Sequence, residues 1–152
     1  MISGRLTITG GTFNTTSTSI GAGTFGSGQL TISTGGVWHN SGARNIGTGS
    51  AGTLMIQNNG DATGVAAVIG GNQNGTATVT GIGSTWALSS SLDVKKGALN
   101  INNSALVRNA AATVGTDASS VATATVGGGI WSCSGLLTIG DFGTGTLNIQ
   151  TA

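Results

Sequence analysis

One short phrase recurs seven times along the sequence, and this repetition constrains the fold more than any other feature. The phrase begins with a small residue and ends with two apolar residues that are separated by one residue of any type, as in Gly4-Arg-Leu6-Thr-Ile8. Its copies start at Gly4, Gly28, Gly52, Gly75, Gly97, Ala122 and Gly145. The steps between these starts are 24, 24, 23, 22, 25 and 23 residues. Such regular spacing indicates one structural unit repeated along an axis.

Each repeat contains two further phrases that resemble short strands. The second often follows a glycine and includes Val37-Trp38 or Thr85-Trp86, and the third ends in an apolar residue and glycine, as in Ile46-Gly47. All three alternate apolar with polar residues, which is the period of a β-strand and not of a helix. Turn-forming Gly, Asn, Ser and Asp separate them. We therefore expect three short strands in each repeat.

The even spacing favours a parallel coil over an antiparallel sandwich, which would need hairpin turns and a less regular repeat. The predicted fold is all-β: a right-handed single-stranded parallel β-helix (β-solenoid), with about 22–25 residues per rung, where a rung is one turn of the coil. Residues 1–152 would form a single segment of six full rungs and a closing strand. At about 4.8 Å per rung the column would be roughly 30 Å tall.

Alternation within the phrases predicts three stacked columns of core side chains. The first holds Leu6, Leu30, Leu54, Ala77, Leu99, Ala124 and Leu147. The second holds Ile8, Ile32, Ile56, Val79, Ile101, Val126 and Ile149. The third holds Ile20, Ile46, Ile69, Val94, Val114 and Ile139. Arg44 also falls at a nominally inward position, and because a buried unpaired charge is unfavourable we expect its guanidinium to lie in solvent at a corner.

Composition and charge exclude several classes of protein. Charged residues make up 6% of the chain, proline is absent and the net charge is +1, with the basic residues scattered, so no nucleic-acid partner is expected. No apolar run reaches about 18 residues, so we expect no membrane insertion of this segment. One cysteine and one histidine cannot form an ordinary zinc site or an internal disulfide. We expect no metal and no cofactor.

The carboxylates offer the first candidates for chemistry. Asp117 and Asp141 stand 24 residues apart in glycine-rich turns and would lie about one rung apart. Glycoside hydrolysis needs two carboxyl groups about 5–10 Å apart, and turn aspartates can also bind Ca²⁺. The favoured interpretation is that both are turn residues, because aspartate forms local hydrogen bonds there.

Three other candidates have a structural and a chemical interpretation. His39 could form a nucleophile relay with Asp61 of the next rung, although no nucleophile is placed beside it, and a surface imidazole is favoured. Cys133 is expected to be a small packed hydrophobic residue and not a reactive thiol. Lys95 and Lys96 are expected to be solvated charges that discourage aggregation, with an anion or carbohydrate contact as the alternative.

The outward side of the first strand is the candidate ligand surface. Its middle column contains Thr7, Thr31, Thr78 and Thr125, interrupted by Met55, Asn100 and Asn148. A flat threonine array could bind ice, as Thr-x-Thr solenoids do, but threonine is also a favourable strand residue.

Two segments resemble the repeats of autotransporter passenger domains, which are bacterial surface proteins. They are Gly81-Ile-Gly-Ser-Thr-Trp86 with the following Leu92-Asp-Val94 and Gly97-Ala-Leu-Asn-Ile101, and Leu137 to Ile149. The resemblance covers nearly the whole chain and implies a secreted right-handed β-helix used in adhesion or as a stalk. The segment Val94-Lys-Lys-Gly97 departs from the glycine spacing of these repeats. Because the chain lacks a secretion signal and a translocating barrel, the resemblance implies an internal segment of a longer protein.

The resulting hypothesis is a non-catalytic structural or adhesive module of a bacterial extracellular or cell-surface protein. Its partners would be surface glycans or proteins of a host or a neighbouring cell. Open solenoid ends expose strand edges, so neighbouring rungs of a longer protein or an end-to-end copy would cover them. The alternatives are therefore a self-assembling fibre subunit, an ice-binding solenoid and, least favoured, a polysaccharide-active enzyme.

Overall fold

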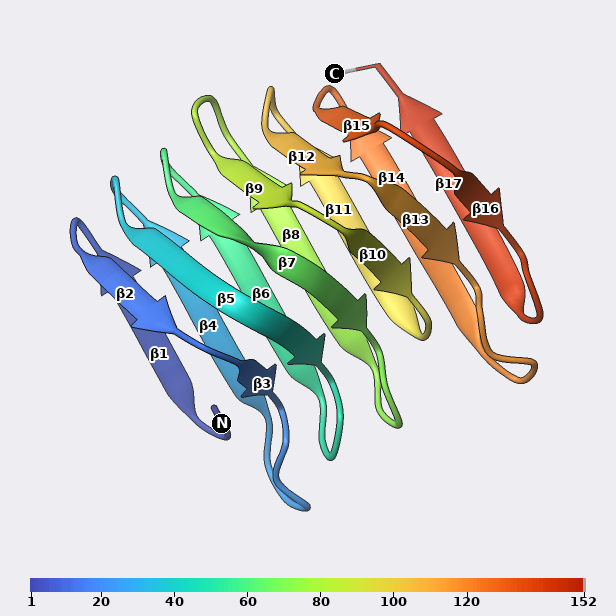
Figure 1. Cartoon of the computed structure of the whole chain (residues 1–152), viewed down its shortest axis with the longest axis horizontal. Helices are drawn as coiled ribbons and strands as arrows, with labels where there is room; N and C mark the ends of the chain where they lie inside the picture. The colour runs from blue at the N-terminus through green and yellow to red at the C-terminus, as the bar shows by residue number, and fades with distance from the viewer. Residues whose placement is uncertain (152) are drawn as a thin grey trace.

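The computed structural model describes residues 1–151 and shows an all-β chain that winds into a β-solenoid of about six turns (Figure 1). The first phrase of every repeat forms one strand of a seven-stranded sheet. Its strands, in order, are β1 (Arg5–Thr9), β4 (Gly28–Ser33), β6 (Gly52–Gln57), β8 (Gly75–Thr80), β11 (Gly97–Asn102), β14 (Val121–Gly127) and β17 (Thr144–Gln150).

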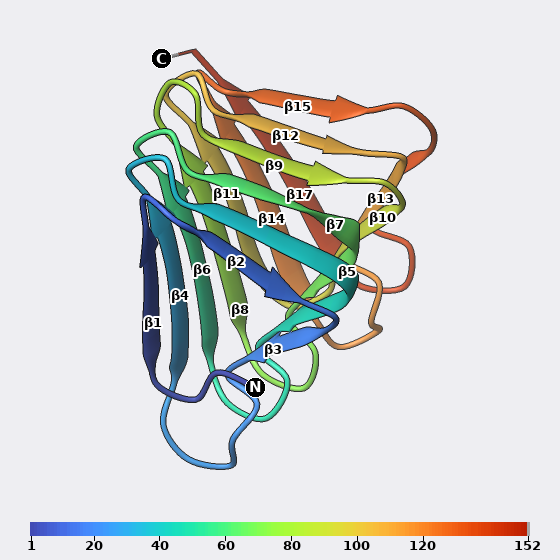
Figure 2. The ribbon, with the colours of Figure 1, turned by 60° about the vertical axis from the view of Figure 1, so that its left-hand side comes forward.

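The second and third phrases together form a ten-stranded sheet, which crosses in front of the first sheet in Figure 2. Its strands are β2 (Thr12–Thr15), β3 (Thr18–Ile20), β5 (Val37–Ile46), β7 (Asp61–Ile69), β9 (Thr85–Leu88), β10 (Ser91–Val94), β12 (Leu106–Asn109), β13 (Ala111–Val114), β15 (Ile130–Cys133) and β16 (Leu137–Ile139). The prediction of three strands per rung is confirmed for rungs 1, 4, 5 and 6. In rungs 2 and 3 the second and third phrases join into the single strands β5 and β7.

The pairing between rungs confirms the alignment that the repeats predict. Every ladder between named strands is parallel, and Leu30 pairs with Leu54 just as Ile32 pairs with Ile56. The small leading residue of each phrase, a glycine in every copy except Ala122, lies where the chain turns into the sheet. A Cβ atom on Gly75 would lie 2.3 Å from the Ile46 carbonyl oxygen of rung 2, so no larger residue fits there. The regular glycines therefore allow close stacking of successive rungs.

The three predicted columns form the core, but Leu6 in the first rung is only partly buried and the residues at the far end are partly buried or exposed. Leu30, Leu54 and Leu99 are fully buried along one axis. Ile139 and Ile149 are 39% and 77% exposed, although both belong to these columns. Ile139 lies on β16 and Ile149 on β17, and each of these strands pairs with a neighbour on one side only. Their apolar side chains therefore stay in contact with solvent.

A second regularity runs along the inward side of the ten-stranded sheet: large and small side chains alternate from rung to rung. One column reads Phe13, Trp38, Ala62, Trp86, Val107 and Trp131. Another reads Thr18, Arg44, Ala67, Leu92, Ala112 and Leu137. The even rungs carry the large member in both columns. Close packing then requires space elsewhere, and the first-strand column supplies it in rungs 4 and 6 with Ala77 and Ala124.

The corner between the second and third phrases follows the same two-rung period. Between the inward residues that flank it, odd rungs place two residues (16–17, 65–66 and 110–111) and even rungs place three (41–43, 89–91 and 134–136). The longer corners occur in the rungs that carry tryptophan. The structural unit is therefore a pair of rungs, which the sequence analysis did not predict.

Two of the three tryptophans of the even rungs donate hydrogen bonds to the inward residue that precedes the corner of the previous odd rung. Trp38 Nε1 donates to Thr15 Oγ1 (3.0 Å) and Trp131 Nε1 donates to Asn109 Oδ1 (2.7 Å). The matching position below Trp86 is Gly64, which has no side chain, and the buried Trp86 Nε1 has no partner among the described residues. The middle pair of rungs is thus the one whose corner lacks this hydrogen bond.

The expectation for Arg44 is wrong, because its side chain is only 1% exposed. The guanidinium carbon lies 4.3 Å from the ring centroid of Trp38, and Nη2 donates to the backbone oxygen of Thr63. On either side of its corner, rung 3 has only the small inward residues Ala62, Gly64 and Ala67, so the guanidinium fills space that larger residues occupy elsewhere. Burial lowers the pKa of Arg44 to about 10.

Candidate binding surface

The outer side of the seven-stranded sheet is a flat surface with almost no charge, which we call the uncharged face. Its middle column contains Thr7, Thr31, Met55, Thr78, Asn100, Thr125 and Asn148. The flanking columns contain Arg5, Gln29, Thr53, Thr76, Ala98, Thr123 and Thr146, and Thr9, Ser33, Gln57, Thr80, Asn102 and Gln150. Arg5 is its one charged residue, and the other eight of the chain lie elsewhere. Rows repeat about every 4.8 Å across the strands.

The four threonines predicted as a ligand array share one column but differ in exposure. Thr7 is exposed, Thr78 and Thr125 are half-buried, and Thr31, next to Met55, is only 8% exposed. Asn100 Nδ2 donates to Thr78 Oγ1 at 3.5 Å, so neighbouring rungs also exchange hydrogen bonds on this face. The array is therefore a mixed hydroxyl and amide surface and not a uniform row of exposed threonines.

A groove of about 540 Å³ opens at the corner of rungs 1 and 2, on the ten-stranded sheet. We call it the corner groove. It is lined by Asn14, Thr15, Thr16, Ser17, His39 and Ser41. Strand β5 shifts register between Asn40 and Ala43, and this β-bulge lies beside the Thr16–Ser17 turn, where Gly42 approaches the Thr16 backbone oxygen. Sequence analysis missed the groove, because it arises from two corners of unequal length that meet.

The structure does not assemble the relay considered for His39. Its Nδ1 lies 2.6 Å from Thr63 Oγ1, which is its register neighbour on β7. Asp61 lies opposite Val37 and accepts a hydrogen bond from Thr85. The imidazole is exposed, as expected, and borders the corner groove.

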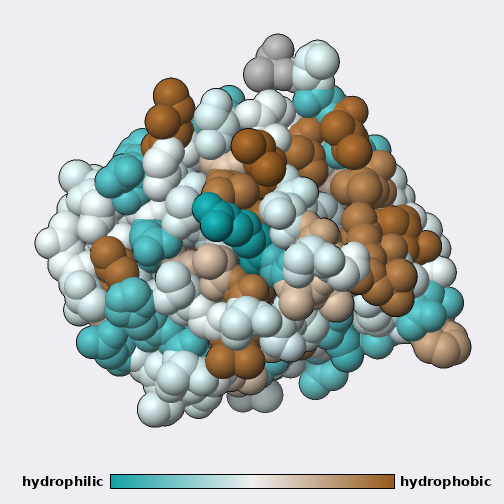
Figure 3. All heavy atoms as spheres, turned by 45° about the horizontal axis from the view of Figure 1, so that its top comes forward, coloured by the Kyte–Doolittle hydropathy of each residue, from teal (hydrophilic) through white to brown (hydrophobic). Residues whose placement is uncertain are grey.

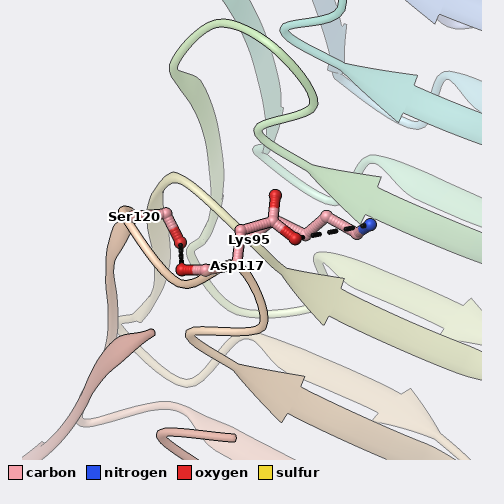
Figure 4. Close-up of polar contacts among 3 residues, drawn as sticks. All are labelled: Lys95, Asp117 and Ser120. Carbon is pink, nitrogen blue, oxygen red and sulfur yellow. Dashed lines mark hydrogen bonds and ion pairs between the residues drawn. The ribbon is translucent and has the colours of Figure 1, made fainter. Parts of the chain in front are cut away.

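Lys95, Lys96, Asp117 and Asp141 lie in the turns that follow the third strands of rungs 4 to 6. Lys95 Nζ lies 3.9 Å from Asp117 Oδ1, and the Ser120 hydroxyl donates to the backbone oxygen of Asp117 at 2.8 Å (Figure 4). Asp141 is exposed on the next turn, where its backbone N–H donates to the Gly115 oxygen. These contacts fit the interpretation of both aspartates as turn residues.

Asp93 is a half-buried carboxylate on the outer side of β10, two residues before Lys95. Burial raises the pKa of Asp93 above its ordinary value, and the positive charge of Lys95 partly opposes this shift.

The last rung exposes an apolar surface, seen as the brown spheres at the right-hand end of Figure 3. A pocket of about 150 Å³ lies there, lined by Val126, Trp131, Cys133, Leu137, Leu147 and Ile149. Cys133 is free and half-buried, and it packs against the core as predicted. The apolar end has the chemistry of a surface on which a further rung would stack.

Residues 1–151 contain no cluster of three or more His, Cys, Asp or Glu side chains that could hold a metal ion. Within the same range no helix is long and apolar enough to cross a membrane.

The fold and its surfaces define the protein as a β-solenoid with one flat uncharged side and one corner groove. Comparisons with protein-family models, with curated proteins and with solved structures give no match.

Proposed function

We propose that this chain is a non-catalytic structural and adhesive module of a bacterial extracellular or cell-surface protein. The uncharged face would contact glycans or proteins on a host or neighbouring cell. The observation that supports this proposal most is the separation of charge: Arg5 is the one charged residue on a face seven strands wide.

The chemistry of the uncharged face suits a neutral, hydroxyl-rich partner. Hydroxyl and amide groups can both donate and accept hydrogen bonds, and their desolvation costs far less than that of ions. The ladder holds these groups at fixed spacing, so little conformational entropy is lost when a partner binds. A partner with a regular array of hydroxyl groups would therefore find many weak contacts at once.

Charge placed on the uncharged face tests this proposal. The double variant Thr78→Glu and Thr125→Glu adds two carboxylates to the middle column, and Thr113→Glu adds one to the third-strand face as a control. Binding of the labelled chain would be measured on an array of neutral and anionic glycans and on intact cells. We expect at least a tenfold loss for the double variant and none for the control. Equal binding by all three proteins, or no binding by the unmodified chain, would contradict the proposal.

End-to-end assembly is a second candidate, favoured by the apolar surface of the last rung. The apolar side chains at this end are partly exposed to solvent: Trp131, Leu137, Leu147 and Ile149. A second copy could cover them as a further rung would. Sedimentation velocity should then show association that grows with concentration and that Ile149→Asp abolishes. A concentration-independent monomer would count against it.

The extracellular location belongs to the same proposal and comes from the resemblance to passenger repeats. Fractionation of cells that produce the full-length protein would test it, with recovery in the surface fraction as the expected result.

Ice binding stays a prediction: the burial of Thr31 and the presence of Met55 make the array uneven. If a thermal-hysteresis assay on the purified chain showed no ice shaping, the ice-binding alternative would be excluded.

A further inference from the structure

We propose that the corner groove binds one sugar unit of a neutral glycan. The groove lies on the ten-stranded sheet, away from the uncharged face, so this inference is independent of the proposed function. Three observations carry it: the way the groove is built, its lining, and the contrast with the equivalent corners of the later rungs.

The shape of the groove is fixed by contacts within the bulge. The backbone N–H of Gly42 donates to Asn40 Oδ1 at 2.9 Å, and Asn40 is only 2% exposed. A Cβ atom on Gly42 would lie 2.2 Å from the Thr16 backbone oxygen, so the two corners approach as closely as a glycine permits. Bulges of this kind commonly redirect side chains next to functional sites.

The lining selects a neutral ligand that can form many hydrogen bonds. All six residues are uncharged, and their hydroxyl, amide and imidazole groups supply both donors and acceptors. An anionic or cationic ligand would find no opposite charge among them. The His39 ring adds a planar surface, held by its Nδ1 contact with Thr63. A volume of about 540 Å³ lies within the usual range for small-molecule sites and is open enough for a glycan chain to continue beyond it.

The later pairs of rungs repeat these corner lengths with a less polar lining. Where the first pair has Thr16, Ser17 and His39, the middle pair has Val65, Ala66 and Ala87. The last pair has Ala110 and Ala111 in place of Thr16 and Ser17. The full polar lining is thus not a requirement of the fold, because two corners of the same length replace part of it with valine and alanine.

The test uses His39 as its own reporter, since the chain contains a single histidine. Its imidazole carbon–proton signal would be followed by NMR during titration with methyl glycosides of glucose, galactose, mannose and N-acetylglucosamine. Sialyllactose serves as the anionic comparison. We expect a saturable shift with at least one neutral glycoside, at a Kd of about 1 mM, because a shallow site offers few contacts. The absence of a shift with every neutral glycoside, or a shift with sialyllactose alone, would overturn the proposal.

Matched variants separate the groove from other causes of a shift. Asn14→Ala combined with Ser41→Ala should weaken binding by at least tenfold, and Ser89→Ala, at the corner position of rung 4 that corresponds to Ser41, should leave it unchanged. Ser17→Phe should block the groove; if that variant does not fold, the double alanine variant decides. The Thr78→Glu, Thr125→Glu variant should keep full binding in this assay, so failure of the uncharged face and failure of the groove are distinguishable. Equal affinity in the groove variants and in Ser89→Ala would contradict the site.

Discussion

The first pair of rungs and the two later pairs share one geometry but differ in chemistry. In every pair the even rung carries a tryptophan and a three-residue corner. Rungs 4 and 6 then place Leu92 and Leu137 at the next inward position, where rung 2 places Arg44. The first pair also has the polar corner, with His39 and the groove. The solenoid therefore tolerates a different chemistry at one corner while it keeps the same corner lengths.

The difference teaches which positions the fold constrains. Inward volumes are compensated between columns, since rungs 4 and 6 combine a tryptophan with Ala77 and Ala124. Rung 2 keeps Leu30 beside Trp38, and the side chain of Arg44 extends instead toward the small residues of rung 3. Packing density thus sets the total volume in each pair and leaves the chemical type of single residues free.

Removal of the fully buried Trp86 should change the stability of the protein more than any other substitution in this comparison. Trp86→Ala leaves a cavity in rung 4 and should lower the free energy of unfolding by about 3–5 kcal/mol. Trp131 is only half-buried in the last rung, so Trp131→Ala should lower the free energy of unfolding clearly less. Chemical denaturation of both variants measures the difference. Equal losses would show that rungs 4 and 6 do not pack as described.

Arg44→Leu should bring rung 2 into line with rungs 4 and 6. It removes a buried cation whose Nε and Nη1 have no partner among the described residues, and it should stabilise the protein by about 1–4 kcal/mol. Arg44→Ala should instead destabilise it, because the space in rung 3 would be left unfilled. A loss of stability in Arg44→Leu would mean that the Trp38 contact outweighs burial of the charge.

The same arginine predicts a dependence on pH. The pKa of Arg44 is about 10 in the folded chain and stays at its higher, ordinary value in the unfolded chain. Between these values the unfolded state binds more protons, so stability should rise as pH increases from about 10 to about 12. Arg44→Leu should lack this rise, and urea denaturation of both proteins across that range would show it. Parallel pH profiles would contradict the buried position of the guanidinium.

Phenylalanine substitutions compare the hydrogen-bonded and the unpaired tryptophan. Trp38→Phe removes the donor that Thr15 accepts, whereas Trp86→Phe removes a buried N–H without a partner among residues 1–151. We expect Trp38→Phe to be about 1 kcal/mol more destabilising than Trp86→Phe. Thermal unfolding of the two variants measures this, and the reverse order would contradict the hydrogen-bond pattern of the corners.

Asp93→Asn should have the smallest effect, and it gives rung 4 the residue type that rung 2 has at Asn45. The pKa of Asp93 is raised in the folded state, so its contribution to stability is present below the unfolded value of 3.8 and is lost as pH rises through the folded value. The variant should therefore be slightly more stable at neutral pH, by less than about 1 kcal/mol, and show no gain at acid pH. A variant less stable at pH 7 would contradict the cause assigned to the shift.

Much of the fold could be predicted from the sequence, because the first phrase encodes it in every repeat. The register of Leu30 with Leu54 and the buried columns follow from spacing and alternation alone. Arg44 was misplaced because a rule about single charges ignores the space left by Ala62, Gly64 and Ala67 in the next rung. The pairing of rungs had a visible signal in the spacing of Trp38, Trp86 and Trp131, which a single-rung alignment obscures.

The binding surfaces were predictable only in part. The column of Thr7, Thr31, Thr78 and Thr125 follows from strand alternation, but the burial of Thr31 depends on its neighbours in three dimensions. The corner groove needed the register shift between Asn40 and Ala43, which no local pattern reveals. His39 was recognised as exposed, while its contact with Thr63 and its place beside Ser41 emerged only from the fold.

The central claim is that successive repeats stack in parallel and in register, and a distance series between spin labels tests it most directly. In a Cys133→Ser background, labels at Gln29, Thr53 or Thr76 would each be paired with one at Thr146, five, four and three rungs away in a single column. Pulsed electron–electron double resonance should give distances of about 24, 19 and 14 Å, a decrease of about 4.8 Å per rung. Distances that do not decrease in this order would contradict the stacked solenoid and every inference built on it.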